Sequence, residues 1–293
     1  MSDWGKGVNN DIGWGQGADN NIGWGSIYDK SFSGDTLLDG GSGYNANYQA
    51  VIDYANSESL TLPNSTIQGL QNDFMVSINP FFSKLKELHL WAGESGLGGF
   101  KSIDFARLNK ADYYNSPSLL ANGIKGNGNS SYVDLKFNYL TESQADSISM
   151  GYYSIDGTDG SSQTIIGASN SVENNTSYIV PNLNNSSRIF IGANTENIQI
   201  NNLSISVGGD DELISVSHNG TQVKLKRNEV SLGIVNKTGN PPNLSAYALA
   251  RNFNGSVVTF SDTTLALTFH ADELTASELG ILSTAIKTYL NSI

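Results

Sequence analysis

The sequence predicts a mainly β protein, a sandwich or jelly roll preceded by a small helical segment and an extended N-terminal arm. Glycine is frequent, with 31 among 293 residues, while charged residues make up only 15%. Glycine, together with abundant asparagine and serine, supplies tight turns. From about residue 96 onward, short runs of alternating apolar and polar residues recur between such turn sequences. Many short strands at this spacing are typical of two packed antiparallel sheets.

Residues 1–44 form the predicted arm, because they contain a tandem repeat of ten residues. Residues 4–13 are followed by a second copy at 14–23, and a truncated third copy begins at Trp24. The many glycines suit neither a helix nor a plain strand, and a flexible linker is the alternative interpretation. A linker has no need of regularly spaced tryptophans, so we expect an extended chain that lies in a partner's groove. The candidate anchoring residues are Trp4, Trp14, Trp24, Ile12 and Ile22.

Residues 45–95 are predicted to form a small helical spacer. Apolar residues in 48–55 recur at helical spacing and indicate a first helix. Ser65 or Thr66 is the expected N-cap of a second helix. A third short helix is expected over residues 82–91, where apolar residues again recur every three or four positions.

Residues 96–293 carry the strand patterns and end in a helical one. Alternation is clearest at 132–137, 147–150, 203–207, 213–216, 223–226 and 265–269. Residues 275–278 read Thr-Ala-Ser-Glu, a capping box, and a stripe of apolar residues follows them. We therefore expect a sandwich with a C-terminal helix that packs against it or against a neighbour.

The composition excludes several classes of partner. A net charge of -12 and a pI near 4.5 repel phosphate backbones, so we expect no nucleic acid. The absence of cysteine rules out disulfides and thiolate metal sites. No apolar run has the length of a membrane span, and the first residues do not read as a secretion signal. We expect no membrane partner.

The sequence offers no recognisable catalytic motif. His89, His218 and His270 are far apart, and each is expected to stand alone as an ordinary surface or strand histidine. Residues 210–212 are consecutive acidic residues, which point to opposite faces of a strand, so they are interpreted as a turn rather than a glycosidase pair. No nucleophile elbow or phosphate-binding loop is found. These observations predict that the protein is not an enzyme.

Two weaker candidate sites lie near the middle of the chain. Asp156 and Asp159 stand in a Gly-rich stretch and are candidate ligands for calcium, the one cofactor considered, although a plain hairpin tip has the same composition. Tyr152 and Tyr153 just before them are candidate glycan contacts, because tyrosine rings stack on sugars. Adjacent strand residues face opposite ways, so at most one of the two is expected to be free.

Three stretches together resemble the structural proteins of tailed bacteriophages. The first is the Trp-Gly repeat leading into Gly-Trp-Gly-Ser-Ile-Tyr at 23–28. The second runs from Tyr-Ala at 54–55 through Phe-Lys-Ser-Ile-Asp-Phe at 100–105 to Ser-Tyr-Val-Asp at 131–134, and the third is spread over 248–278. The resemblance implies a concanavalin A-like or laminin-G-type jelly roll over 96–293 and supplies no catalytic residues.

What this resemblance implies is a non-enzymatic structural component of a phage particle, such as a tail fibre, collar or appendage. The arm would anchor the protein to other virion proteins, and the jelly roll would be displayed. Assembly in the host bacterial cytoplasm and a homotrimer are expected, since phage fibres are commonly three-fold. The alternative is a receptor-binding adhesin that recognises a bacterial surface glycan.

Overall fold

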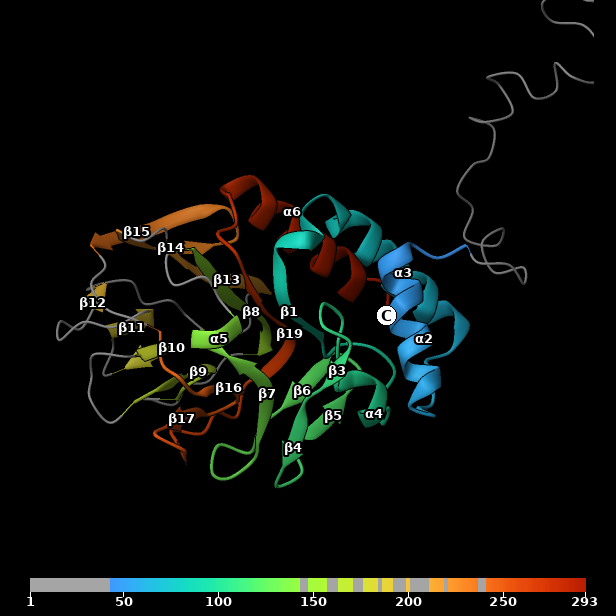
Figure 1. Ribbon diagram of the computed structural model, residues 1–293, viewed down its shortest axis with the longest axis horizontal. Helices are drawn as coiled ribbons and strands as arrows, with labels where there is room; N and C mark the ends of the chain where they lie inside the picture. Colours follow the sequence, from blue (N-terminus) through green and yellow to red (C-terminus); the bar gives the residue numbers. More distant parts are fainter. Residues whose placement is uncertain are drawn as a thin grey trace, which may run out of the picture. The chain divides into compact units, whose positions relative to one another are not determined.

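The computed structural model of the chain describes residues 43–142, 147–156, 163–170, 176–183, 186–191, 199–200, 211–218, 221–236 and 241–293. The chain divides into two units, Met1–Gly43 and Tyr44–Ile293, and the elements described below belong to the second (Figure 1). Within the described ranges, no helix has the length and apolar character needed to cross a membrane.

Three long helices form where the sequence pattern predicts them. Helix α2 (Ala46–Ser57) buries the predicted face, and helix α3 (Ser65–Ile78) follows it. The N-cap of α3 is Asn64, whose side chain accepts from the backbone N–H of Ile67, and not Ser65 or Thr66 as expected. Helix α6 (Ala276–Leu290) begins with the predicted capping box. The side chains that α2 buries are Tyr48, Val51, Ile52 and Ala55.

The predicted third helix over 82–91 is wrong. The chain forms a 3-10 helix η3 (Asn79–Lys84) and then strand β1 (Leu85–Leu90). Strand β1 pairs antiparallel with β19 (Thr264–Ala271), a partner nearly 200 residues away that the local pattern does not reveal. The sequence Leu-Lys-Glu-Leu-His-Leu has apolar residues at both helical and alternating spacing, so the distant partner decides the outcome.

The strands form two large, mainly antiparallel sheets. The first, called here the helix-covered sheet, has the order β15-β14-β13-β8-β19-β6-β5, with β1 beside β19. The other strands of this sheet are β5 (Ser118–Leu120), β6 (Gly123–Lys125), β8 (Ile148–Asp156), β13 (Glu212–His218), β14 (Gln222–Arg227) and β15 (Val230–Asn236).

The second sheet, called here the outer sheet, has the order β12-β11-β10-β9-β16-β7-β4, with the hairpin of β17 and β18 beside β9. Its strands are β4 (Asp112–Tyr114), β7 (Tyr132–Asn138), β9 (Ile166–Ser169), β10 (Thr176–Leu183), β11 (Ser186–Ile191), β12 (Gln199–Ile200), β16 (Ser245–Ala248), β17 (Arg251–Phe253) and β18 (Ser256–Val258). Short connecting elements are α4 (Gly98–Lys101), β2 (Ile103–Asp104), β3 (Asn109–Lys110) and α5 (Tyr139–Glu142).

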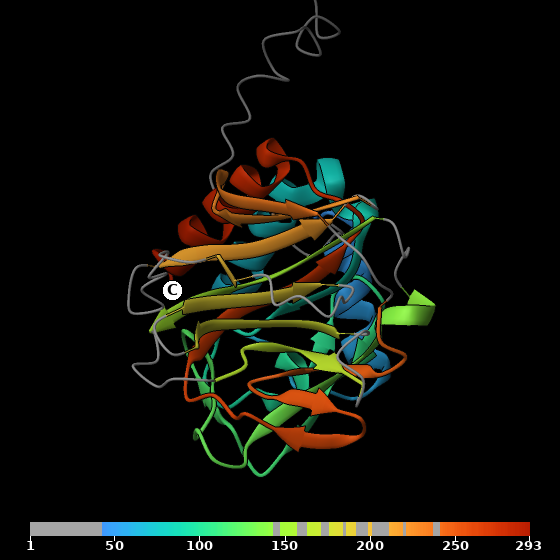
Figure 2. The same cartoon turned by 90° about the vertical axis from the view of Figure 1, so that its left-hand side faces the viewer.

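The elements stack in three layers with two apolar cores between them. The long helices lie on one face of the helix-covered sheet, and the outer sheet lies on its other face (Figures 1 and 2). Strand β19 is buried at every position, because both of its faces are covered. Phe269 packs toward the helices, whereas Leu265 belongs to the core between the sheets. The predicted mainly β jelly-roll sandwich, preceded by a helical segment, is confirmed.

The strand predictions at 132–137, 147–150, 213–216, 223–226 and 265–269 fall within or overlap observed strands. The strand predicted at 203–207 lies outside the described residues. The segment predicted as a helical spacer, 45–95, contributes to the same core as the sheets, because α2, α3 and β1 supply side chains to it.

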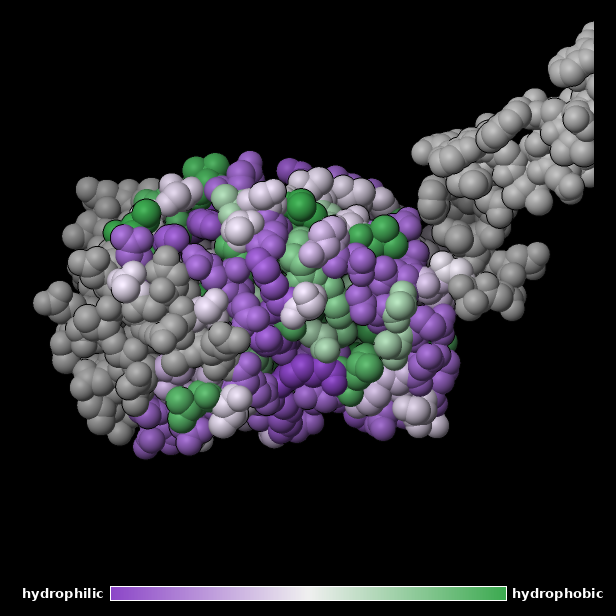
Figure 3. All heavy atoms as spheres, turned by 45° about the horizontal axis from the view of Figure 1, so that its top comes forward, coloured by the Kyte–Doolittle hydropathy of each residue, from purple (hydrophilic) through white to green (hydrophobic). Residues whose placement is uncertain are grey.

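The helical side of the molecule contains a hollow between α3 and α6. Its volume is 610 Å³, and its lining includes small side chains such as Ser77, Ser277 and Gly280. Figure 3, which brings the top of Figure 1 forward, shows apolar residues in patches among hydrophilic ones. The exposed apolar side chains of Val76 and Ile281 belong to these two helices.

We predict that residues 44–293 fold without the arm, whereas residues 96–293 alone do not form a stable domain. The shorter fragment lacks α2, α3 and β1, so it leaves the apolar face around Leu267 and Phe269 exposed to water. Thermal unfolding should be cooperative for 44–293, and 96–293 should aggregate or bind a hydrophobic dye. An equally cooperative transition of 96–293 at the same temperature would contradict this account.

Candidate functional site

The predicted anchoring residues of the arm are not placed by the structure. The structure does not describe any of these five residues, which are Trp4, Trp14, Trp24, Ile12 and Ile22. Their role in binding a partner stays a prediction from the sequence.

The predicted glycan contact at Tyr152 and Tyr153 is wrong. The two side chains point to opposite faces of β8 as expected, but both are fully buried. Tyr152 lies in the core between the sheets, and Tyr153 lies under the helices, where its hydroxyl donates to the carbonyl of Asp211 (2.5 Å). The sequence argument assumed one face open to solvent, and the helices cover that face. Neither ring can stack on a sugar.

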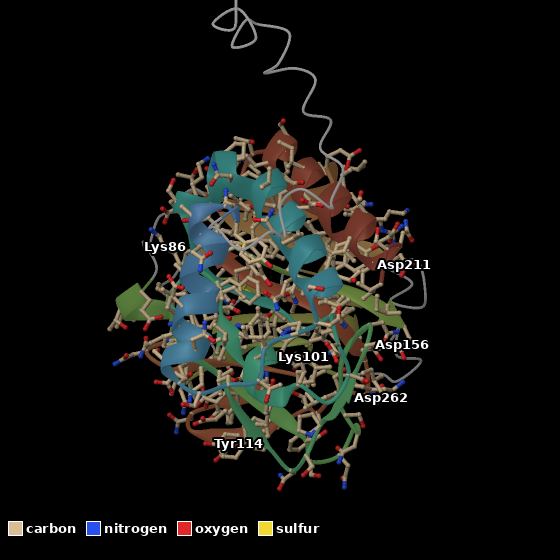
Figure 4. All side chains as sticks on the ribbon, turned by 90° about the vertical axis from the view of Figure 1, so that its right-hand side faces the viewer. Lys86, Lys101, Tyr114, Asp156, Asp211 and Asp262 are labelled. Atoms are coloured by element: carbon tan, nitrogen blue, oxygen red, sulfur yellow. The ribbon has the colours of Figure 1, made fainter. Side chains whose placement is uncertain are left out.

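The candidate calcium ligand Asp156 is engaged by protein groups. Its carboxylate binds Lys125 Nζ (2.7 Å) and accepts from the backbone N–H of Thr264 (2.5 Å). Burial alone raises the pKa of Asp156, but the hydrogen bonds from Lys125 and Thr264 outweigh it and hold the pKa below its usual value. Asp159 lies outside the described residues, and the described part of the chain shows no group of three acidic or histidine side chains arranged for a metal. Figure 4 shows Asp156 near the edge of the molecule.

Two histidines that the sequence analysis expected to stand alone meet at one buried carboxylate. Glu87 on β1 lies opposite His270 on β19 in the strand register, and His89 follows two positions along β1. Glu87 Oε2 lies 2.7 Å from His270 Nδ1, and Glu87 Oε1 contacts His89 Nδ1. All three side chains are 0% exposed, which places the group inside the sandwich.

Oxygen acceptors lie at both ring nitrogens of His89. Its Nε2 lies 3.2 Å from the carbonyl of Ser102, and its Nδ1 contacts the Glu87 carboxylate. Burial alone raises the pKa of Glu87, but the charge of His89 and the hydrogen bonds from both histidines outweigh it and keep the pKa well below its usual value. Glu87 is therefore a buried carboxylate whose charged form is stabilised by its two histidine neighbours.

Aromatic and polar neighbours enclose the buried group of Glu87, His89 and His270. Trp91 Nε1 donates to Thr268 Oγ1 (3.1 Å), which donates to Glu87 (3.3 Å), and the Trp91 ring stacks on His89 at 4.5 Å. His270 Nε2 lies 3.0 Å from the Tyr139 hydroxyl. These contacts join β1, β19 and α5, and the group has no exposed surface through which a substrate could reach it. We interpret Glu87, His89 and His270 as a structural group that holds these elements together, and we call it the buried clamp.

The outer sheet presents a row of aromatic rings on the face that points away from the core. Tyr114 on β4 and Tyr132 on β7 stack nearly parallel, with ring centroids 4.7 Å apart and a 3° interplanar angle. Tyr247 on β16 follows at 4.9 Å, and Phe260 lies 6.4 Å from Tyr132. Val133 beside Tyr132 points into the core, as strand alternation requires. We call these four residues the tyrosine ladder; Tyr114, its 39% exposed end, is labelled in Figure 4.

Polar side chains lie beside the ladder on the same face. Asp112 and Asp134 are opposite each other across β4 and β7. Lys136 Nζ bridges them, at 2.6 Å from Asp112 and 3.2 Å from Asp134, and the Ser245 hydroxyl donates to Asp134 (2.5 Å). Burial raises the pKa of Tyr247 to about 12, so its hydroxyl remains a donor at neutral pH. The face thus combines apolar rings with hydrogen-bonding groups.

The row of aromatic residues continues across β9 to β10. Tyr247 and Tyr178 lie on the two sides of Gly167 in the strand register. Gly167 has φ +144°, and a Cβ there would approach the Tyr178 Cβ within 2.2 Å, so glycine is required for this close approach. Arg251 lies over the Tyr178 ring, 4.8 Å from its centroid, and 5.3 Å from the centroid of Phe253.

Comparisons with known proteins identify the fold and leave the family open. No family model matches the chain, and no curated protein matches it in sequence. Domain 4 of the extracellular GH43 arabinanase AbnA from Geobacillus stearothermophilus, solved with arabinotriose, is similar in structure. Its TM-score is 0.51 at 13% identity, over 68% of this chain and 98% of that chain. The sialidase of Trypanosoma rangeli with sialic acid gives a TM-score of 0.49 at 13% identity, over 76% of this chain and 39% of that chain.

These comparisons correct the prediction that the protein is not an enzyme. The arabinanase domain belongs to a glycoside hydrolase, so the fold occurs within enzymes and gives no ground for excluding one. The likeness at 13% identity shows the fold alone.

Sequence reasoning missed both the buried clamp and the tyrosine ladder. The clamp had one local signal, a Glu and a His at alternate positions of an otherwise apolar segment, 85–90. The ladder had a signal in the alternation of 132–137, which places Tyr132 on the polar face of that strand. Neither signal identifies the partner strands.

We predict that Glu87→Gln lowers the free energy of unfolding by about 3–5 kcal/mol at neutral pH, because it removes the buried carboxylate that both His89 and His270 contact. Glu87 has a lowered pKa in the folded state, so its contribution is present above the unfolded value of about 4.3 and is lost as pH falls. Denaturant unfolding between about pH 5 and pH 3 should therefore show a shallower loss of stability for the variant than for the wild type.

The control for this experiment is Glu58→Gln. Glu58 pairs with Lys110 at the surface (2.6 Å), where ion pairs contribute little. This variant should retain the stability and the pH profile of the wild type. Equal effects of the two substitutions would contradict the assignment of the clamp.

Proposed function

We propose that the jelly roll is a glycan-binding domain and that the tyrosine ladder on the outer sheet is its binding surface. The observation that carries this proposal is a row of partly exposed aromatic rings in mutual contact, on a sheet face that the helices do not cover. The sequence predicts glycan binding as the alternative function and places it at Tyr152 and Tyr153. The present proposal keeps that function and assigns it to partly exposed residues of the outer sheet.

The chemistry of the surface suits a sugar. The apolar C–H face of a pyranose or furanose ring packs against an aromatic ring, and its hydroxyls need donors and acceptors at the edge. Tyr114, the 39% exposed end of the ladder, supplies such a ring, and its stacking on Tyr132 at 4.7 Å fixes its orientation. The Tyr247 hydroxyl can donate, and the Asp134 carboxylate can accept. Lys136 pairs with both Asp112 and Asp134, so it offsets part of the negative charge of these two carboxylates.

The arabinanase domain, solved in complex with arabinotriose, gives context for this proposal. It belongs to an extracellular arabinanase, and its fold is similar to that of the present chain. Since the likeness is one of fold alone, the proposal rests on the ladder.

We predict that Tyr114→Ala weakens binding to a glycan ligand by about 5-fold to 150-fold, which corresponds to the loss of one stacking contact of roughly 1–3 kcal/mol. Tyr114 is 39% exposed, so the substitution should leave the thermal stability nearly unchanged. Tyr114→Phe, which keeps the ring, is the matched control and should bind like the wild type. Isothermal titration with a ligand identified on a glycan array provides the measurement. Unchanged affinity of Tyr114→Ala would place the binding surface elsewhere.

We propose further that the chain is a component of a tailed phage particle, displayed by its N-terminal arm. The ten-residue Trp-Gly repeat supports this second proposal, because three regularly spaced tryptophans serve a protein that docks on a partner. Other virion proteins are the proposed partners, and a homotrimer is the proposed assembly. The particle would carry the glycan-binding face toward the host surface.

Replacing Trp4, Trp14 and Trp24 by alanine should abolish incorporation into the particle, because each buried aromatic anchor contributes roughly 2 kcal/mol or more to an interface. The same variant should keep its glycan affinity, since its folded unit is intact. Immunodetection on purified particles measures incorporation. Normal incorporation of the triple variant would show that attachment does not depend on the repeat.

A further inference from the structure

Arg251 is held by aromatic rings but donates no hydrogen bond from its side chain to the described part of the chain. The guanidinium lies over Tyr178 at 4.8 Å and over Phe253 at 5.3 Å. Its Nε is enclosed and lacks an acceptor there, and no carboxylate within the described ranges forms an ion pair with it. An arginine carries five N–H donors in the plane of the guanidinium. Rings that contact the faces of this plane leave the terminal Nη groups at its edge for a partner, whereas Nε is enclosed.

Arg107 shows what a structural arginine looks like in the same molecule. It also lies over a ring, that of Phe137 at 5.4 Å. Its donors are used, however: Nε binds Asp104 (2.5 Å), Nη1 binds Glu142 and the Lys136 carbonyl, and Nη2 donates to the Leu135 carbonyl (2.9 Å). The comparison distinguishes a saturated arginine from Arg251, which is oriented by rings but has no hydrogen-bond or ion-pair partner among the described residues.

Arg251 also continues the tyrosine ladder. Tyr178 under Arg251 and Tyr247 of the ladder flank Gly167 on either side, so they are two strand spacings, or about 10 Å, apart. The short hairpin that carries Arg251 is fixed by Asn252, whose side chain donates to the Ser245 carbonyl (2.9 Å) and accepts from the Gly255 N–H (2.9 Å). The arginine is therefore presented at a set position beside the ladder.

We infer that the glycan bound by the outer sheet is anionic, and that Arg251 binds its carboxylate or phosphate group while the tyrosine ladder stacks on the neighbouring sugars. This inference rests on the proposed function and names the ligand class of that site. A planar guanidinium edge matches a carboxylate or a phosphate in a two-point contact. The chain as a whole has a net charge of -12, and Arg251, which has no ion-pair partner in the described part of the chain, places a positive charge at the β17 end of this face, where it can attract an anionic group.

The test uses the full chain and paired probes that differ in charge alone. Oligogalacturonate and its methyl ester form one pair, and glycerol phosphate oligomers serve as the phosphate probe. Wild type, Arg251→Gln, Arg251→Lys and Lys287→Gln are compared on these probes and on a glycan array. Lys287 is exposed on α6 at the helical side, so its substitution removes the same charge away from the outer sheet.

We expect the wild type to prefer an acidic probe over its neutral counterpart by about 10-fold or more. Arg251→Gln should lose this preference, Arg251→Lys should keep part of it, and Lys287→Gln should keep all of it. The affinity for the acid should fall with added salt. Preference for the carboxylate or for the phosphate probe identifies which anion is bound.

Two results would overturn the inference. Binding of neutral and acidic glycans with equal affinity, sensitive to Tyr114→Ala but not to Arg251→Gln, would leave the proposed function intact and remove the anionic ligand. A wild-type chain that binds no glycan on the array would remove the proposed function together with the inference. Thermal unfolding of each variant shows whether a lost affinity is due to a lost fold.

Discussion

The fold depends on one constraint: the helix-covered sheet has two apolar faces, and both must be kept from water. Strand β19 is buried at every position, with Phe269 facing the helices and Leu265 facing the outer sheet. The helices α2, α3 and α6 cover the first face, and the outer sheet covers the second. As a result, the sheet face that remains open in the described structure is the far side of the outer sheet, where the tyrosine ladder lies.

The buried clamp and the ladder are connected through β7. On its inner side, Phe137 stacks on His270 at 4.3 Å, and His270 belongs to the group around Glu87. Arg107 donates to the carbonyls of Leu135 and Lys136, where Lys136 adopts φ +56°, so an irregular stretch of this strand is held by a charged side chain. On its outer side, the same strand carries Tyr132 and Asp134. A clamp that fixes β7 from within therefore also fixes the spacing of the rings outside.

Features that arise from neighbouring residues could be predicted from the sequence. The capping box of α6 is a local arrangement of Thr275 and Glu278, and the buried face of α2 follows from helical periodicity. Features that depend on the pairing of strands distant in the sequence could not be predicted. Three findings follow from which elements cover one another, and the local pattern of a single sequence does not contain that information. They are the strand, rather than helix, at 85–90, the contact of His89 and His270 with one carboxylate, and the burial of both Tyr152 and Tyr153. The ladder is of this second kind, because Tyr114 and Tyr132 meet Tyr247 and Phe260, which come from a part of the chain more than 100 residues later.

The central claim is that the open face of the outer sheet binds a glycan. Backbone amide chemical-shift mapping of residues 44–293, titrated with oligosaccharides released from a bacterial surface, tests it most directly. The account predicts that the shifts concentrate in β4, β7, β16 and the hairpin of β17 and β18, with α3 and α6 unaffected. Shifts confined to the hollow between α3 and α6, with the outer sheet unchanged, would contradict it.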